Sequence, residues 1–551
     1  MNIYCVMKYL LVFSLMIMSI SCQSSYPEVE QWHTYEITLS STNSYDNPYT
    51  DVDVWAVFFN QAGDTLIRPG FWSGGNSWKI RFATPDDSSF WSWKSFSSNI
   101  NDSNLHGKMG RIKSIPSKST NRLLTNGLLE MSPVGRNVVH KNGQSFVIVG
   151  DTPWALPFRA TIEQVQEYAS FRKAQGFNTA LLMVVQPDMD ADGPSDRGVW
   201  EGFARGFFDL HKGHINQLNP EYFNYLDTLI DILIENEIVP VYQPLFHGFG
   251  WKGLRVLGNE VDSDEYVRFC KYLLARYGSK PAMWLLSADN DGKGPGIVES
   301  GLMLEEWDCY WQPTGLHYNP CSDFQAPWAD EIDHVRCFHY DKSYQDAEWL
   351  DFQWAQTGHS GVHDFSKVWR MYDNHPIKAV ANGEPTYEGM GGGSSGLGWW
   401  QGHDAWMQLM SGGTMGVVYG AAGLWQWQVT YDEPGWDSWA SQRMSWRDAM
   451  KQDGANYVGL ISRVFNDLNV RDIERRWDLN IENHPMLVKG KHLYIAYLPQ
   501  GGVITIPQLA DDMNYKWFNP VTGLFTNLNP TFGTISFTAP EIKPYVLVIT
   551  R

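Results

Sequence analysis

The stretch of sequence that decides the fold is Ile377-Lys378-Ala379-Val380-Ala381-Asn382-Gly383-Glu384-Pro385. Its first half is largely apolar and predicts a buried strand, and Glu384 follows at the end of that strand. A second stretch, Met283-Trp284-Leu285-Leu286-Ser287-Ala288-Asp289, has the same form. Barrels of parallel strands hold their reactive groups at the carboxyl ends of the strands. The two stretches therefore predict a barrel with a pair of carboxylates at its mouth.

Six other runs in residues 125–455 complete eight predicted strands. They are Phe146–Asp151, Asn178–Val185, Ile238–Phe246, His334–His339, Phe352–Thr357 and Gly416–Tyr419 with Leu424–Trp427. Helices are predicted between the strands: Thr161 and Gln164 form a capping box for one, and Asn219 precedes Pro220 at the start of the next. Strands that alternate with helices indicate a (β/α)8 TIM barrel. By this count Asp289 follows the fourth strand and Glu384 ends the seventh.

All-β segments are predicted on both sides of the barrel. In residues 27–115, Trp78-Lys79-Ile80-Arg81-Phe82 alternates with the period of a half-buried strand. Residues 456–551 again contain short strands, and His492–Leu498 and Gly502–Ile506 are predicted to pair as a hairpin. The sequence thus predicts a multidomain chain with a β-sandwich on each side of the barrel.

Residues 1–22 have the form of a lipoprotein signal peptide. Lys8 precedes an apolar run, Tyr9–Ile20, that is shorter than an ordinary membrane span. Ser19-Ile20-Ser21-Cys22 resembles a bacterial lipobox, and polar residues follow the cysteine. We expect export and attachment to the outer or cell membrane, in the periplasm or at the cell surface, through a lipid on Cys22. Plain secretion without the lipid is the alternative.

The composition limits the class of partner. The net charge is -19 at pH 7, which argues against nucleic acid because a phosphate-binding surface needs a basic patch. The chain contains 26 Trp and 26 Tyr. Most of these rings are expected to pack in cores, and some to stack on the flat faces of sugar rings. A carbohydrate is therefore the expected substrate.

No cofactor and no metal are expected. Asp188–Asp196 matches only the first half of a calcium loop, because Val199 stands where a bidentate Glu is needed. The histidines near the predicted strand ends form no HxH or HExxH pair; they are His247, His339, His359 and His403. Cys309 and Cys321 either form a disulfide in an oxidising compartment or stay free.

Polar and aromatic side chains gather at the ends of the predicted strands. Those expected to contact substrate are Asp151, Trp154, Gln243, His247, Asn290, His339, Gln356, His359, Tyr387, Glu388, Trp425 and Gln426. Glycoside cleavage needs one acid to protonate the leaving oxygen and a second carboxylate to attack carbon or activate water. Asp289 is predicted to be the proton donor and Glu384 the nucleophile, kept ionised by Tyr387 or His339. If Asp289 only caps its loop, Asp291 or Glu388 is the alternative donor.

A resemblance to a known family rests on five groups of residues. They are Gly150-Asp151-Thr152-Pro153-Trp154, Phe338-His339, Asp351-Phe352 with Gln356-Thr357-Gly358-His359, Asn382-Gly383-Glu384-Pro385 with Tyr387-Glu388-Gly389, and Tyr419-Gly420-Ala421 with Leu424-Trp425. Together they resemble the apiosidase-like glycoside hydrolase catalytic domain across the predicted barrel. The N-terminal segment is similar to the domain that often precedes such barrels, and the C-terminal segment resembles a β module of the collagen-binding type.

The resemblance implies an exported retaining glycoside hydrolase that acts on a complex plant or algal polysaccharide or oligosaccharide. An Asp after strand four is the acid/base of the family and a Glu after strand seven the nucleophile, which correspond to Asp289 and Glu384. The surroundings Ser287-Ala288 and Asn290-Asp291-Gly292 depart from the family pattern, and this leaves the sugar open. The alternative is a catalytically inactive surface glycan-binding protein, which needs no pair of acids.

Overall fold

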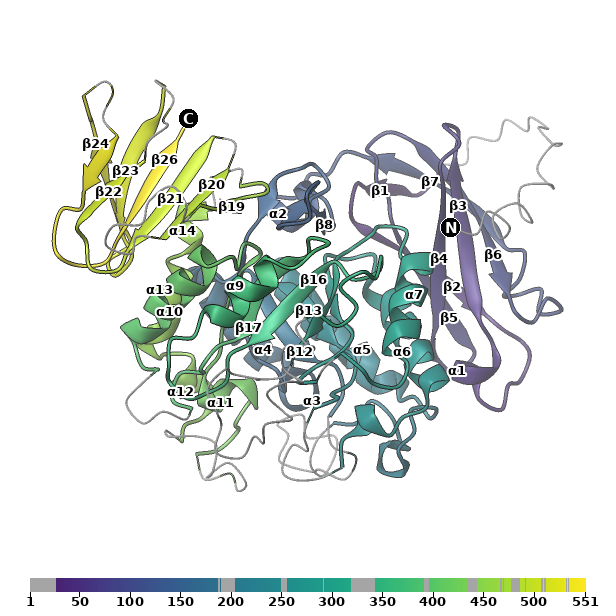
Figure 1. The fold of residues 1–551 in the computed structure, drawn as a ribbon. Coiled ribbons are helices and arrows are strands. Elements are labelled where there is room, and N and C mark those ends of the chain that lie inside the picture. Colours follow the sequence, from purple (N-terminus) through teal and green to yellow (C-terminus); the bar gives the residue numbers. More distant parts are fainter. Residues whose placement is uncertain are drawn as a thin grey trace.

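An eight-stranded barrel lies between an N-terminal and a C-terminal β domain in the computed structural model (Figure 1). The residues that the structure describes are 26–186, 189, 204–248, 255–290, 292–318, 342–390, 396–431, 433, 443–465, 468, 470–476, 486–490, 492–506, 509, 512–531, 533 and 535–551. Among these residues, no helix has both the length and the apolar character needed to cross a membrane.

The barrel is closed and all of its strands are parallel. In order around the barrel they are β11 (Ile148–Asp151), β12 (Thr179–Met183), β13 (Val239–Gln243), β14 (Met283–Leu285), β15 (Thr314–His317), β16 (Phe352–Gln356), β17 (Ala379–Glu384) and β18 (Gly416–Tyr419). β11 pairs with both β12 and β18, which closes the sheet. The predicted (β/α)8 barrel is confirmed, with Asp289 after the fourth strand and Glu384 at the end of the seventh.

One predicted strand was wrong, and another was right only in its first half. The fifth strand is β15, not residues 334–339, which lie outside the described part of the chain together with His339. β15 is only four residues long. It contains Gly315, and a Cβ at this position would lie 2.4 Å from the ring of Phe352. In the predicted eighth strand only Gly416–Tyr419 is extended, since Ala422–Trp425 forms the helix α11.

Helices form the outer layer of the barrel. The longer ones are α4 (Ile162–Gln175), α5 (Pro220–Glu235), α6 (Ser263–Tyr277), α7 (Ile297–Trp307), α9 (Ser366–Tyr372), α10 (Trp399–Met410) and α13 (Asp453–Gly459); the shorter ones are α2 (Arg122–Thr125), α3 (Leu156–Arg159), α12 (Trp446–Ala449) and α14 (Ser462–Phe465). The predicted capping box of Thr161 and Gln164 is present at α4, which ends at Gly176 with φ of +101°. Asn219 caps α5 with Pro220 in its first turn, as predicted.

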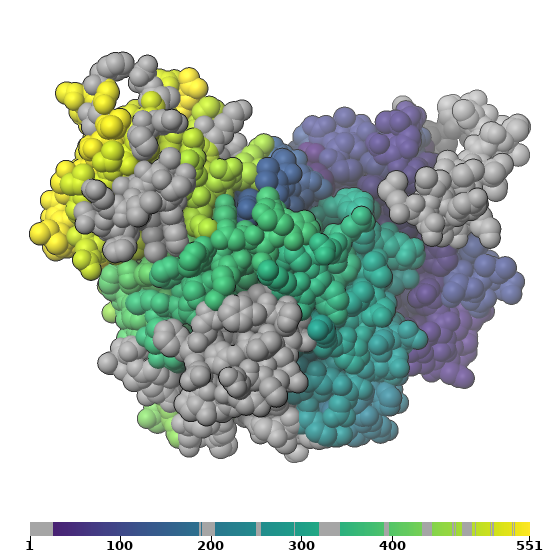
Figure 2. All heavy atoms as spheres, viewed as in Figure 1, coloured from purple at the N-terminus to yellow at the C-terminus, as the bar shows by residue number. Residues whose placement is uncertain are grey.

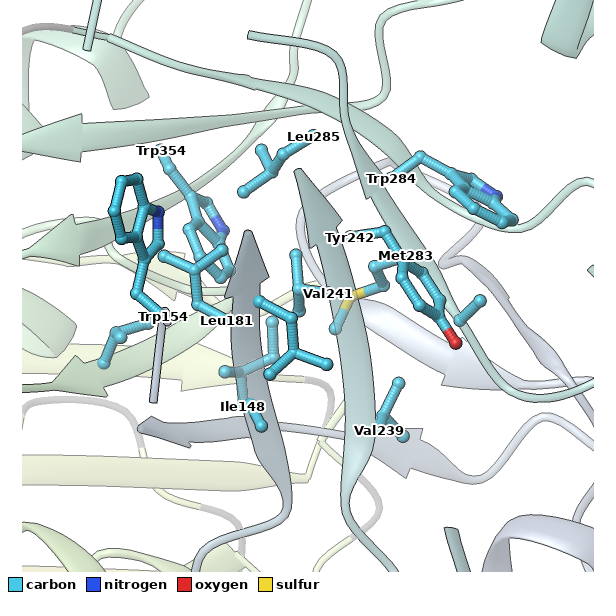
Figure 3. Close-up of a cluster of buried hydrophobic side chains, with 14 of the residues drawn as sticks. Ile148, Trp154, Leu181, Val239, Val241, Tyr242, Met283, Trp284, Leu285 and Trp354 are labelled. Atoms are coloured by element: carbon cyan, nitrogen blue, oxygen red, sulfur yellow. The ribbon is translucent and has the colours of Figure 1, made fainter. Parts of the chain in front are cut away.

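Side chains alternate between the barrel interior and the helical layer, and this alternation positions the site. On β13 the ring of Tyr242 points outward and stacks on Tyr277 of α6, with 5.1 Å between centroids. Val239 and Val241 lie on the opposite face of the strand from Tyr242, and Figure 3 shows all three within one apolar cluster. Gln243 is in phase with these valines at the end of the strand, so its amide faces the barrel mouth.

The N-terminal domain is a seven-stranded sheet folded into two layers. Its strands are β1 (Glu28–Glu30), β2 (Thr34–Ser40), β3 (Val54–Asn60), β4 (Thr65–Gly74), β5 (Ser77–Ala83), β6 (Phe90–Ser97) and β7 (Met109–Ile115), with the helix α1 (Pro48–Asp51) between β2 and β3. β4 pairs with β3 through Thr65–Pro69 and with β5 from Gly70 onward. Between the layers, the rings of Phe58 and Phe82 stack at 3.9 Å.

Buried ion pairs fix this domain to the barrel. Asp227 of α5 accepts hydrogen bonds from Arg81 of β5 at 2.6 Å and from Arg276 of α6 at 2.7 Å. The pKa of Asp227 falls to about 2, because the two guanidinium groups outweigh its burial. Arg68 of β4 donates to the backbone oxygen of Leu274 at 3.0 Å. The domain is thus joined to α5 and α6 by paired charges rather than by a linker alone.

The C-terminal β domain packs on the other side of the barrel, as Figure 2 also shows. Its six-stranded sheet has the order β19 (Glu474–Arg475), β20 (Met486–Gly490), β21 (Leu493–Leu498), β26 (Tyr545–Thr550), β23 (Asn514–Asn519), β24 (Leu524–Leu528). A second sheet of this domain pairs β22 (Val503–Thr505) with β25 (Ser536–Thr538). A separate small sheet of β8 (Leu129–Met131), β9 (Val138–His140) and β10 (Ser145–Phe146) precedes the barrel in the chain. The predicted hairpin was wrong, because β21 pairs with β20 and β26 and not with β22. The hydroxyl of Tyr497 lies 2.5 Å from Nδ1 of His403 on α10.

Candidate active site

Glu384 reaches the barrel mouth through an irregularity in β17. Asn382 pairs with Ala355 and Glu384 with Gln356, so that Gly383 is an extra residue in the ladder. A Cβ on Gly383 would lie 2.4 Å from the ring of Trp354. Asn382 faces outward, beside Gln401 and Asp404 of α10. In a regular strand Glu384 would point the same way as Asn382, and the bulge at Gly383 is what redirects the carboxylate.

Asp289 is held by an irregular extension of β14. The chain beyond Leu285 continues beside β15, because the amide of Leu286 donates to Gly315 and the amide of His317 donates to Ser287. Asp289 itself has a left-handed backbone, with φ of +53°. Such a conformation is uncommon outside glycine and often occurs at functional sites. Gly248 lies against it, so close that a Cβ on Gly248 would be 2.5 Å from that of Asp289.

The two carboxyl groups face each other. One oxygen of Asp289 and one oxygen of Glu384 lie within 4.8 Å of each other. The side chains are 10% and 12% exposed, so that both acids remain open to a molecule in the barrel mouth while most of their surface is desolvated.

The surroundings move the pKa values of the two acids in opposite directions. Burial raises the pKa of Asp289 well above its usual value, and the negative charge of Glu384 raises it further. Burial acts in the same direction on Glu384, but the hydrogen bond from His359, the electrostatic interactions with His359 and His317, and the hydrogen bond of Gln356 outweigh it and lower its pKa. When the pair holds a single proton, Asp289 therefore carries it and Glu384 is ionised, which is the division that an acid and a nucleophile require.

His359 is a fixed hydrogen-bond donor to Glu384. Its Nδ1 accepts the backbone N–H of Tyr387 at 3.2 Å, so this nitrogen presents a lone pair. The proton of the neutral ring is then on Nε2, which lies 3.0 Å from Oε1 of Glu384. The ring also packs on Tyr387, with 4.6 Å between centroids. A backbone amide thus sets the tautomer that stabilises the ionised carboxylate.

His317, at the end of β15, stands between the two acids. Its Nε2 is 3.6 Å from Oε2 of Glu384, and its Nδ1 is 3.8 Å from Oδ1 of Asp289. Nδ1 accepts the side-chain amide of Gln243 at 3.2 Å. Burial lowers the pKa of His317 to about 4, so the ring is neutral at pH 7. The imidazole contributes a directed N–H rather than a positive charge.

Asp289, His317 and Glu384 also form the one group of potential metal ligands found among the described residues. A histidine ligand must offer a lone pair to the metal. The lone pair of His317 is on Nδ1 and is occupied by the Gln243 amide, while Nε2 carries the proton. The donor set in this arrangement therefore fits two carboxyl groups beside a neutral imidazole better than a metal centre.

A family model described as "Apiosidase-like, catalytic domain" matches residues 132–472, which is more than half of the chain. The chain belongs to the apiosidase-like family. It is accordingly a glycoside hydrolase with a carbohydrate substrate. Residues 28–98 match a domain of unknown function, DUF5060, at the position of the N-terminal sheet.

Solved structures share the fold of this apiosidase-like protein. A protein titled "Glycoside hydrolase" is 18% identical, with a TM-score of 0.63 over 78% of this chain and 98% of its own. A family 5 glycoside hydrolase from Bacteroides vulgatus ATCC 8482 is 18% identical, with a TM-score of 0.61 over 78% and 93%. A proposed glycoside hydrolase from the same organism is 17% identical, with a TM-score of 0.68 over 95% and 99%. No curated protein matches the chain.

Several residues that the sequence predicted do surround the two acids of the apiosidase-like site. Gln356 acts on the pKa of both carboxyl groups. Burial raises the pKa of Tyr387, and the charges of Glu384 and Asp289 raise it further, which indicates that its hydroxyl is near both. Trp154 lies one side chain further away: its indole N–H donates to Gln243, and its ring packs against Trp425 with 5.7 Å between centroids. His359 contacts Glu384 as described above, and Asn290 follows Asp289 and bridges to Tyr318.

Other predicted contacts are used inside the apiosidase-like domain and are not brought to the two acids. Asp151 is fully buried and pairs with Arg172 at 2.6 Å. Glu388 accepts the amide of Gly398 at 2.7 Å and is buried. The amide of Gln426 donates to Gln428 within its own loop. His247 packs on Tyr266 of α6, with 5.3 Å between centroids.

Some predictions fall outside the described residues and stay predictions. These are the lipidated Cys22, the acidic loop at 188–196 apart from Met189, the alternative donor Asp291, His339 and Cys321. Cys309 forms no disulfide with a described cysteine, and its pairing with Cys321 stays a prediction.

Two residues near the acids were not predicted from the sequence. His317 was overlooked because its strand is four residues long, although Leu316-His317-Tyr318 does place a polar residue after an apolar one. Lys367 of α9 is 1% exposed and donates to the backbone oxygen of Gln356 at 3.3 Å. Its charge lowers the pKa of Asp289, against the effect of burial. A lysine in an amphipathic helix gives no sequence signal that it will be buried behind a site.

Proposed function

We propose that this apiosidase-like protein cleaves a glycosidic bond with retention of configuration, with Asp289 as acid/base and Glu384 as nucleophile. The observation that carries the proposal is the pair of carboxyl groups, within 4.8 Å of each other, whose pKa values are moved in opposite directions. Retaining glycosidases hold their carboxyl groups about 5–5.5 Å apart, because the nucleophile must itself reach the sugar carbon.

In the first step the proton of Asp289 passes to the glycosidic oxygen while Glu384 attacks the anomeric carbon. The bond to the leaving alcohol breaks, and the sugar is left esterified to Glu384. In the second step Asp289, now ionised, takes a proton from water, and the oxygen of that water displaces Glu384 from carbon. The N–H of His359 holds Oε1 of Glu384 and stabilises the carboxylate each time that it is released.

The substrate class that we propose is a branched plant or algal polysaccharide or an oligosaccharide derived from one. The support is the family resemblance, together with the half-buried ring of Trp425, which packs 5.7 Å from the ring of Trp154. The alternative, an inactive glycan-binding protein, gives no account of the opposed pKa values of Asp289 and Glu384, since binding alone does not require one protonated and one ionised carboxyl.

Retention is the test of this proposal. A panel of plant and algal polysaccharides identifies a cleaved substrate, and proton NMR then follows the anomer that is released first, before mutarotation. We expect the anomer of the substrate. Adding methanol is expected to give the methyl glycoside of the same configuration, since methanol intercepts the covalent intermediate. Release of the opposite anomer would contradict the role of Glu384 as nucleophile.

We also propose that the protein is exported and tethered by a lipid on Cys22. The support is the sequence Ser19-Ile20-Ser21-Cys22 after an apolar run. When the full-length protein is expressed in a bacterium fed labelled palmitate, we expect the label to be incorporated and the protein to fractionate with membranes. Cys22→Ala is expected to lose both. Equal labelling of the wild type and Cys22→Ala would exclude the proposed anchor.

A further inference from the structure

A buried chain of hydrogen bonds runs from the first barrel strand to the fifth. The indole N–H of Trp154 donates to Oε1 of Gln243 at 2.7 Å. The amide nitrogen of Gln243 lies 3.2 Å from Nδ1 of His317. The three side chains are 7%, 1% and 1% exposed, so water does not compete for these bonds. His317 then points Nε2 toward Glu384.

The direction of each bond in this chain is determined by the first one. An indole N–H can only donate, so the oxygen of the Gln243 amide must face Trp154. The amide nitrogen must then face His317, and an amide nitrogen can only donate. Nδ1 of His317 is therefore the acceptor, and the neutral ring carries its proton on Nε2. Trp154 thus sets the orientation of Gln243, and Gln243 sets the tautomer of His317.

We propose that Gln243 is a positioning residue that keeps His317 in the Nε2–H tautomer, with this N–H turned toward Oε2 of Glu384 across 3.6 Å, and prevents Nε2 from acting as a metal ligand. That the N–H of His317 stabilises the carboxylate of Glu384 as a nucleophile rests on the proposed function. The tautomer and the exclusion of metal do not, because they follow from the hydrogen-bond chain alone.

The positions of the three side chains explain why metal binding has to be prevented here. Asp289, His317 and Glu384 offer ligand atoms within 4.8 Å of one another, close to what a zinc ion requires. Histidine ligands commonly donate their second N–H to a carboxylate or carbonyl, which leaves the other nitrogen free for the metal. Gln243 stands where that carboxylate or carbonyl would be, but it donates an N–H to Nδ1 of His317 instead of accepting one from it.

Gln243→Glu reverses this polarity with little change in shape. A carboxylate at residue 243 accepts from Trp154 as before and also accepts from Nδ1–H of His317, which moves the ring proton and frees Nε2. We expect the affinity for zinc, measured by calorimetry with zinc chloride on the full chain, to rise about 10- to 100-fold over the wild type. Nitrogen-15 NMR of histidine-labelled protein is expected to show His317 as Nε2–H in the wild type and as Nδ1–H in Gln243→Glu.

Two further variants keep the test decisive. Gln243→Glu combined with His317→Gln is expected to lose the gain in zinc affinity, since the imidazole is gone while the added carboxylate remains. Trp154→Phe, which removes the N–H that orients the amide, is expected to give a mixture of both His317 tautomers even if Gln243→Glu fails to fold. An Nδ1–H pattern in the wild type, or a single unchanged Nε2–H pattern in Trp154→Phe, would overturn the proposal. These readouts need no substrate, so they stand apart from the outcome for Glu384.

Discussion

Glu384→Gln is expected to lower kcat/KM on the cleaved glycoside on the order of 10⁴-fold or more, because an amide cannot form the glycosyl ester. This corresponds to about 5 kcal/mol of transition-state stabilisation. The fold is expected to survive, since Gln has the shape of Glu and its oxygen can still accept the N–H of His359. The measurement is the initial rate on the substrate found in the polysaccharide panel, beside a thermal melt of each protein.

A small anion sharpens the experiment on Glu384. In Glu384→Ala, azide can enter the space of the carboxylate and attack the anomeric carbon directly. We expect partial recovery of the rate and a glycosyl azide of inverted configuration, because only one displacement then occurs. Glu388→Gln is the matched control: its carboxylate binds the amides of Gly398 and Gly454, and we expect a loss of less than about 10-fold. A larger loss in Glu388→Gln than in Glu384→Gln would contradict the assignment.

Asp289→Asn is expected to slow the first step by about 10²- to 10⁴-fold on a natural alcohol leaving group, the usual contribution of a general acid. An aryl glycoside whose phenol leaves without protonation is expected to lose far less in that step, measured as the initial burst of phenol. Azide added to Asp289→Ala is expected to give a glycosyl azide of retained configuration, opposite to the product of Glu384→Ala. Equal losses on both leaving groups would exclude Asp289 as the proton donor.

The pH dependence of the first step follows from the same two groups. Asp289 must be protonated, so the rate is present below its raised pKa and falls as the pH rises through that value. Glu384 must be ionised, so the rate also falls as the pH drops through its lowered pKa. The two directions predict a broad maximum that extends above the range of an ordinary aspartate. In Asp289→Asn the alkaline decline is expected to disappear and the acidic one to remain.

The sequence predicted the positions of the two acids because each follows an apolar run that could be counted as a strand. Counting placed Asp289 and Glu384 on strands four and seven even though the fifth strand was misplaced. That error did not matter for the order, since residues 314–317 and 334–339 both lie between the fourth and the sixth strand. It did matter for the site, because His317 is on the strand that was missed.

The sequence pattern did not predict whether a side chain at a strand end points toward the two acids or away from them. Asp151 and Glu388 end strands or follow them, as Glu384 does, yet both are held among backbone amides or arginine in the layer behind the site. Whether a residue at a strand end points into the barrel mouth or away from it depends on its place in the alternation of side chains. For Glu384 one extra residue in the strand shifts that alternation. A bulge depends on the neighbouring strand and not on local composition.

The contact between Gly383 and Trp354 has a consequence for how such sites diverge. Because the ring of Trp354 occupies the space where a Cβ at 383 would lie, the two positions share one volume. A side chain larger than hydrogen at 383 is compatible only with a smaller residue at 354, and neither change is neutral when it occurs first. The two positions are thus expected to vary together among relatives. A chain that has lost the glycine but kept the tryptophan is a candidate for a homologue whose carboxylate no longer faces the sugar.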